Sequence, residues 1–175
     1  MKFNRIAIIA ILAILTVVLA GSASAFDLGF LTGGDNGPQK ITVGGIEFNI
    51  PAGFTENEDY KMDNEKSNST TGVDYTMSAA GFEDDKKEKA IYILVGDYRD
   101  YNVTDQVIEY VLDGMDYEKK TINGHEGYLV QQTTSDSSSL MATEQPVYMF
   151  VYEENGDLVF IGATDESYFG DVIIE

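Results

Sequence analysis

Residues 91–95 read Ile-Tyr-Ile-Leu-Val, and this stretch decides the fold. A strand that is apolar on both faces lies at the centre of a sheet covered from both sides. The run therefore predicts a central strand over residues 90–96, with helices packed on the sheet. A charged tip at residues 83–88 connects it to residues 73–82, which predicts that these two segments pair as neighbouring strands.

Three two-residue turns predict three further hairpins, because Gly-Gly and Asn-Gly adopt the positive φ angles that tight turns between strands require. Each turn is flanked by β-rich segments: Gly44-Gly45 by residues 40–43 and 46–50, Asn123-Gly124 by 117–122 and 125–131, and Asn155-Gly156 by 147–152 and 158–163. In the first hairpin, apolar residues at 46, 48 and 50 alternate with polar ones, so one face is predicted to be buried.

Two helices are predicted. The clearer one spans residues 104–113, where Thr104 is placed to cap the N-terminus and Gly114 follows the end. Its apolar residues form one stripe with helical spacing, at Val107, Ile108, Val111 and Leu112. Asp165 is predicted to cap a last helix, whose apolar residues are Phe169, Val172, Ile173 and Ile174.

The remaining segments of the chain are polar or rich in glycine. Residues 26–39 are predicted to be a flexible lead, residues 55–72 a long surface loop or frayed strand, and residues 132–145 a Ser/Thr-rich loop. With about eight strands, mostly antiparallel, and two helices, the expected class is α+β. One domain is expected over residues 40–175, because the chain is too short for two.

The N-terminus has the order of a secretory signal peptide. Lys2 and Arg5 precede an apolar run at residues 6–20, and Ala23-Ser24-Ala25 forms a cleavage site of the A-x-A type. The run is short for a spanning helix, which needs about 20 apolar residues. We therefore expect an extracytoplasmic protein, secreted or at the cell surface, that loses residues 1–25. The alternative is retention as an anchor, in which case residues 6–20 are the only contact with the membrane.

The charge balance excludes one class of partner. The chain carries 30 Asp and Glu against 11 Lys and Arg, so its net charge is −19, and removal of Lys2 and Arg5 makes it −21. A field of this sign repels the phosphates of nucleic acids, so we expect no nucleic-acid partner. There is no cysteine, which rules out disulfides, thiolate zinc sites and a lipid anchor on cysteine.

Two motifs resemble those of the PsbP-like family, which includes an extrinsic photosystem subunit and small prokaryotic envelope proteins. Residues 46–54, IEFNIPAGF, resemble its opening F-x-I-P-x-G-(aromatic), and residues 122–128, INGHEGY, resemble its central hairpin. The terminal hairpin at 147–163 and the helix from Asp165 resemble the end of the family's fold. The resemblance implies an antiparallel sheet with helices on its faces, an α/β/α sandwich. It brings no catalytic or metal-binding residues with it.

No catalytic residue is predicted. His125 is the only histidine, and its place beside the Asn123-Gly124 turn is more typical of a solvated or hydrogen-bonded side chain than of a base or ligand. Ser137, Ser138 and Ser139 lack the sharp turn of a nucleophile elbow. Paired carboxylates for glycoside hydrolysis stay open, because sequence spacing does not reveal them. Acidic residues near 97–102 and 113–116 do not match a calcium loop, so no dedicated metal site and no cofactor is expected, and weak cation binding by these carboxylates stays open.

Two kinds of surface site stay as candidates. Asn68 and Asn102 each begin an Asn-x-Thr sequon for glycosylation. Asn68, in the polar loop, is the better candidate because Thr104 is expected to cap the helix. Tyr148 and Tyr152 would form a binding patch if their face of the sheet were open, although packing inside the sheet is the more usual role.

These observations favour a non-catalytic binding or accessory domain at the cell envelope, with an unknown envelope component or small ligand as its partner. The alternatives are an extracytoplasmic hydrolase that uses paired carboxylates and a structural component of the envelope.

Overall fold

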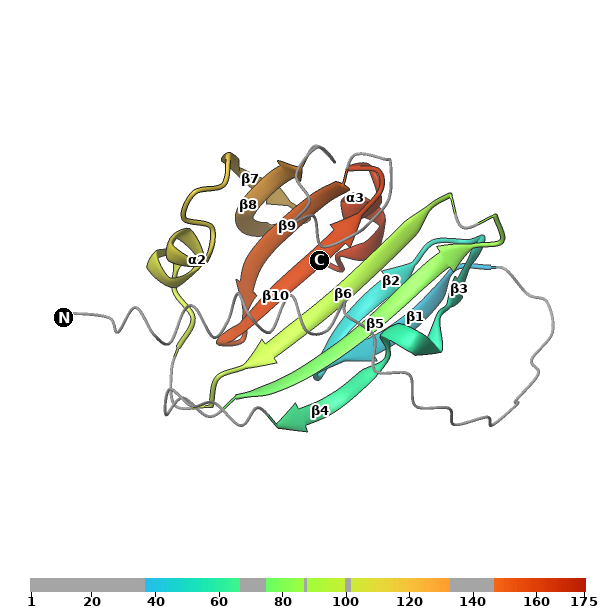
Figure 1. Cartoon of the computed structure of the whole chain (residues 1–175), viewed down its shortest axis with the longest axis horizontal. Coiled ribbons are helices and arrows are strands. Elements are labelled where there is room, and N and C mark those ends of the chain that lie inside the picture. Colours follow the sequence, from blue (N-terminus) through green and yellow to red (C-terminus); the bar gives the residue numbers. More distant parts are fainter. Residues whose placement is uncertain (1–36, 67–74, 87, 100–101, 133–146) are drawn as a thin grey trace.

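The computed structural model describes residues 37–66, 75–86, 88–99, 102–132 and 147–175 (Figure 1). The expected signal peptide, most of the Gly-rich lead and nearly all of the loop at 132–145 lie outside these residues. Within the described part of the chain, no helix has the length and apolar character needed to cross a membrane.

The elements follow the order of the predicted segments. They are β1 (Gln39–Val43), β2 (Ile46–Ile50), β3 (Phe54–Glu56), the 3-10 helix η1 (Glu58–Tyr60), β4 (Met62–Lys66), β5 (Thr76–Asp84), β6 (Ala90–Asp97), α2 (Asp105–Val111), β7 (Tyr117–Ile122), β8 (His125–Gln132), β9 (Val147–Glu154), β10 (Asp157–Ala163) and α3 (Tyr168–Val172). The α+β class is confirmed.

The main sheet is antiparallel, with the strand order β3-β5-β6-β10-β9-β8-β7 and with β4 also paired to β5. The predicted central strand, β6, lies between β5 and β10. The hairpins at Asn123-Gly124 and Asn155-Gly156 are confirmed, and both asparagines have the positive φ that the turns need, 46° and 56°. Their side-chain amides distinguish the two turns, as described below.

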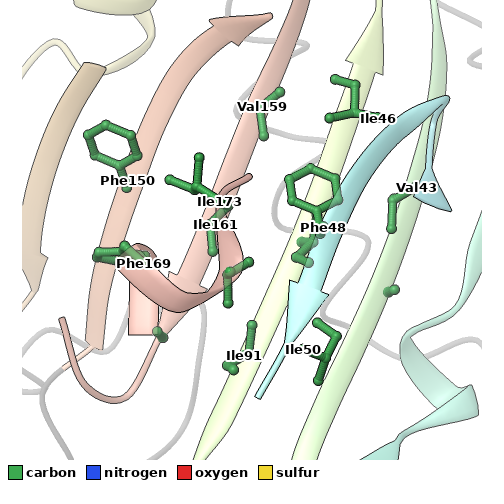
Figure 2. Close-up of a cluster of buried hydrophobic side chains, with 14 of the residues drawn as sticks. Val43, Ile46, Phe48, Ile50, Ile91, Phe150, Val159, Ile161, Phe169 and Ile173 are labelled. Atoms are coloured by element: carbon green, nitrogen blue, oxygen red, sulfur yellow. The ribbon is translucent and has the colours of Figure 1, made fainter. Parts of the chain in front are cut away.

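The first hairpin forms but does not join this sheet. β1 and β2 make a two-stranded sheet of their own, which packs across β5 and β6. Figure 2 shows side chains of this hairpin, among them Ile46, Phe48 and Ile50, lying against the inward-facing residues of the main sheet. We call this side of the main sheet the hairpin face; α3 covers its other half, through Phe169, Val172 and Ile173. The cover expected from helices is thus shared between a helix and a hairpin.

The opposite side, which we call the α2 face, has its own buried cluster. Ile108, Val111 and Leu112 from the predicted stripe are buried there, and Val107 is half-buried. They pack with sheet residues such as Tyr128, Val130 and Val151. The expected cap is only partly correct: Thr104 takes the N-cap position, but its side chain makes no capping hydrogen bond.

Residues 55–66, the described part of the polar segment at 55–72, are more ordered than expected. They contain β3, η1 and β4, and both of these strands pair with β5. β4 is irregular, because its register shifts between Met62 and Glu65 and because Asn64 has φ 48°. This end of the sheet therefore finishes in a bulged strand, whereas the other end finishes in the regular strand β7.

Candidate functional site

His125 has a structural contact at the C-terminal end of the chain. Its Nε2 lies 3.0 Å from the carbonyl oxygen of Ile174, which only accepts hydrogen bonds, so the ring nitrogen is the donor. On the other side, the imidazole lies against the ring of Tyr152, with centroids 5.0 Å apart. This nitrogen therefore has a structural partner within the folded chain.

The β7–β8 hairpin also holds α3, through the side chains of Asn123 and Lys120. The side-chain amide of Asn123 donates to the carbonyl oxygens of Gly170 and Ile173, at 2.8 and 2.7 Å. These oxygens belong to the end of α3, where carbonyls lack partners inside the helix. Lys120 forms an ion pair with Glu166 in the turn before α3. The β7–β8 turn thus closes the C-terminal end of the fold, and its polar groups are used for this purpose.

The two candidate binding tyrosines both lie on the hairpin face. Tyr152 is 1% exposed and packs on Phe150 and His125. Tyr148 is half-buried against the same cluster. The expectation of an open patch formed by both rings is therefore wrong, because α3 and the residues after it cover this part of the sheet. Burial raises the pKa of the Tyr152 hydroxyl, as it does for a phenol kept from water.

The two sequons have different positions. Asn102 is described and exposed, just before α2, and the hydroxyl of Thr104 is not used as a cap. The reason for ranking Asn102 below Asn68 therefore does not hold. Asn68 lies outside the described residues. Modification at either position stays a prediction.

Three carboxylates lie close together at the ends of three adjacent strands. Leu158 pairs with Gly96, so Asp157 on β10 comes next to Asp97 on β6, and Asp157 pairs directly with Glu154 on β9. Partial burial and, next in size, the charge of Asp97 raise the pKa of Asp157. No cluster of acidic or histidine side chains that would hold a metal is present in the described part of the chain.

A different set of polar groups gathers where α2 meets β7. Lys119 on β7 lies 3.0 Å from the carboxylate of Glu109 on α2 and 3.6 Å from that of Asp105. Its ammonium also lies 4.9 Å from the centre of the Tyr128 ring, and the Tyr128 hydroxyl donates to Glu109 at 2.9 Å. The bonds from Lys119 and then Tyr128 lower the pKa of Glu109, so this carboxylate is ionised at neutral pH.

Tyr117 completes this group. Its ring meets the ring of Tyr128 edge to face, with centroids 5.3 Å apart. Tyr117 is 40% exposed, and no other large hydrophobic side chain among the described residues is exposed. We call Tyr117, Lys119, Asp105 and Glu109 the β7–α2 site.

The sequence analysis did not find the β7–α2 site. Its members lie at positions 105, 109, 117 and 119, in two different elements, and no motif connects them. One signal was present: Tyr117 begins a strand segment whose next four residues are polar, so its ring has no apolar neighbour among them to pack with. The pairing of α2 with this edge of the sheet could not be read from the sequence.

One of the three comparisons with known proteins found a similar protein. No family model matches the chain, and no curated protein matches it. A solved structure does: the solution structure of cyanobacterial PsbP from Synechocystis sp. PCC 6803, with a TM-score of 0.44 and 17% sequence identity. The match covers 85% of this chain and 99% of that chain. In fold, the chain is similar to this structure.

Proposed function

We propose that this protein is an extracytoplasmic, non-catalytic binding domain that contacts an envelope protein through the β7–α2 site. The observation that carries the proposal is the exposure of Tyr117. Tyrosine is enriched at protein interfaces because its ring buries a large area while its hydroxyl stays hydrogen-bonded. Here the ring is held edge-on by Tyr128 and needs no reordering to meet a partner.

The charge of the domain selects the chemistry of the partner. A surface with a strong negative field attracts basic segments and repels acidic ones. Asp105 lies beside Lys119, and its side chain is 72% exposed. The carboxylate of Asp105 therefore has an open side that a second cation can approach. An arginine of the partner would pair with Asp105 and lie over the Tyr117 ring, where cation–π attraction adds to the ion pair.

Export supports the same proposal. Residues 1–25 have the order of a cleaved signal, so the domain would work outside the cytoplasmic membrane. The intact mass of the protein recovered from the medium or cell surface tests this. A mass that begins at Phe26 agrees with the proposal, whereas a mass that includes residues 1–25 contradicts cleavage.

Enrichment from an envelope extract tests the site itself. The immobilised domain should retain a component that Tyr117→Ser releases and that rising salt weakens, because the contact is partly ionic. Thr42→Ala is the matched control: Thr42 is exposed on β1, part of the hairpin on the other face of the sheet. If Tyr117→Ser and Thr42→Ala retain the same proteins as the unchanged domain, the β7–α2 site is not the binding surface.

A further inference from the structure

We propose that β7 is a self-pairing edge, through which two copies of this chain join their sheets in an antiparallel dimer. This inference does not depend on the proposed partner, because it needs only the edge strand and its own sequence. Among the described strands, β7 pairs with β8 alone and ends the sheet. It is visible beyond β8 in Figure 1.

The backbone of β7 leaves three residues with outward-facing groups. Ile122 and His125 flank a two-residue turn, and the residues in that position exchange both hydrogen bonds. Because bonding alternates along an antiparallel pair, residues 118, 120 and 122 bond to β8. The N–H and C=O groups of Tyr117, Lys119 and Thr121 therefore point away from the sheet.

One register satisfies all of these groups in a symmetric pair. If Lys119 lies opposite Lys119 of the second copy, then Tyr117 of each copy lies opposite Thr121 of the other. Each of these three pairs exchanges two backbone hydrogen bonds, and the two-fold axis passes between the lysines. Such an interface is isologous, as in most homodimers.

The side chains support this register on the hairpin face. Glu118 and Lys120 point to the same side of β7, and this register sets Glu118 of each copy opposite Lys120 of the other. Two opposite-charge pairs therefore form across the junction, in the positions where side chains of facing strands come closest. Glu118 is exposed, so it has an open side toward the second copy.

The lysines of β7 do not oppose the pairing on either face of the sheet. Lysine on an edge strand usually prevents association. Here Lys119 is folded over the Tyr128 ring and paired with Glu109, and Lys120 is paired with Glu166. Lys119 is thus neutralised within its own chain, whereas Lys120 has Glu166 of its own chain on one side and would meet Glu118 of the second copy on the other. At the opposite end of the sheet, β4 is interrupted by its bulge, so the regular edge is β7.

The dimer would give the domain two β7–α2 sites on one face of a continuous sheet. The two Tyr117 residues would lie four strand positions apart, about 14 Å along the joined strands. A partner with two basic segments at that spacing would bind both sites with higher effective affinity than one.

Sedimentation equilibrium of the purified exported protein, over a concentration series at about 0.15 M salt, tests the pairing, because this salt screens the net negative charge. We expect a monomer–dimer equilibrium. Thr121→Pro should abolish it, since proline removes an outward N–H and spares the bonds to β8. A monomer at every concentration, or a dimer that survives Thr121→Pro, overturns the proposal.

Charge exchange tests the register. Glu118→Lys alone and Lys120→Glu alone each place like charges opposite one another, so each variant should dimerise about tenfold more weakly. Mixed together, the two variants should form a heterodimer as strong as the original dimer, because both opposite-charge pairs are restored. Circular dichroism of each variant controls for folding. A dimer that Glu118→Lys leaves unchanged, or a mixture that fails to recover, overturns the register.

Discussion

At the scale of single residues, comparison of the asparagines in the two Asn-Gly turns distinguishes what their backbone conformation contributes from what their side-chain hydrogen bonds contribute. Asn123 and Asn155 occupy the same place in their turns with similar positive φ. Only Asn123 reaches another element, through its two bonds to the end of α3. Asn123 therefore serves its own hairpin through its backbone conformation and the closure of the fold through its side chain.

Replacing each asparagine by glycine isolates the two bonds, because glycine keeps the positive φ without strain. We expect Asn123→Gly to lower the free energy of unfolding by about 1–3 kcal/mol, from two lost hydrogen bonds of net value near 1 kcal/mol each. Asn155→Gly, at the matched turn, should change it by less than about 0.5 kcal/mol. Urea unfolding measures both, and equal losses would contradict the closure role of Asn123.

The carboxylate row at Asp97, Asp157 and Glu154 makes a prediction with a defined sign. Like charges directly opposite one another in a sheet are destabilising. Asp157→Asn should therefore raise the free energy of unfolding at pH 7 by about 0.5 kcal/mol. The exposed Asp116, which precedes β7, provides the matched control through Asp116→Asn, with little expected effect.

The pH dependence follows from the raised pKa of Asp157 in the folded protein. The folded state holds this proton more tightly than the unfolded state, so the charge penalty is present above the folded pKa. It disappears as the pH falls below the unfolded value. The gain from Asp157→Asn should therefore be full at pH 7 and lost in acid. A gain that persists in acid would show that the effect is not electrostatic.

At the scale of elements, α3 is stabilised by packing more than by its own length. It has five residues, too few for a stable isolated helix, and its apolar residues lie in the core of the hairpin face. Phe169 is fully buried, with its ring 5.9 Å from that of Phe150. Gly170, the next residue, is exposed, and a methyl group there would meet nothing within 4 Å.

Two adjacent substitutions test this. Phe169→Ala should destabilise the protein by about 3–5 kcal/mol, because it leaves a cavity in the core. Gly170→Ala should stabilise it by about 0.5–1 kcal/mol, since alanine loses less conformational freedom than glycine in a helix. Thermal unfolding compares the two. A small loss from Phe169→Ala would mean that α3 is peripheral to the fold.

The elements also show how far sequence could predict the fold. Residues 91–95 predicted a central strand, and the Asn-Gly turns predicted hairpins, because both signals are local. The same local signals could not show that the β1–β2 hairpin packs on the face of the main sheet and is not one of its strand pairs. Its alternation requires one buried face, and a helix or a sheet can provide the surface that buries it. The burial of Tyr152 was not predictable either, because the sequence does not show which element packs on its face of the sheet.

At the scale of the whole molecule, the few positive charges are not evenly distributed. Of the few cations in the chain, Lys119 and Lys120 lie side by side on the edge strand β7 and are each paired to an acid from another element. The β7 edge is therefore the place where Tyr117, the ion pairs of Lys119 and outward-facing backbone groups meet. We assign contact with other molecules to this edge.

Site-specific photo-crosslinking in the producing cells tests this assignment most directly. A photoreactive phenylalanine analogue replaces Tyr117 in one variant and the exposed Thr42 in the control. We expect a discrete adduct from position 117 that is absent from position 42, with an added mass that identifies either an envelope protein or a second copy of this chain. No adduct at position 117, or the same adducts from both positions, would contradict it.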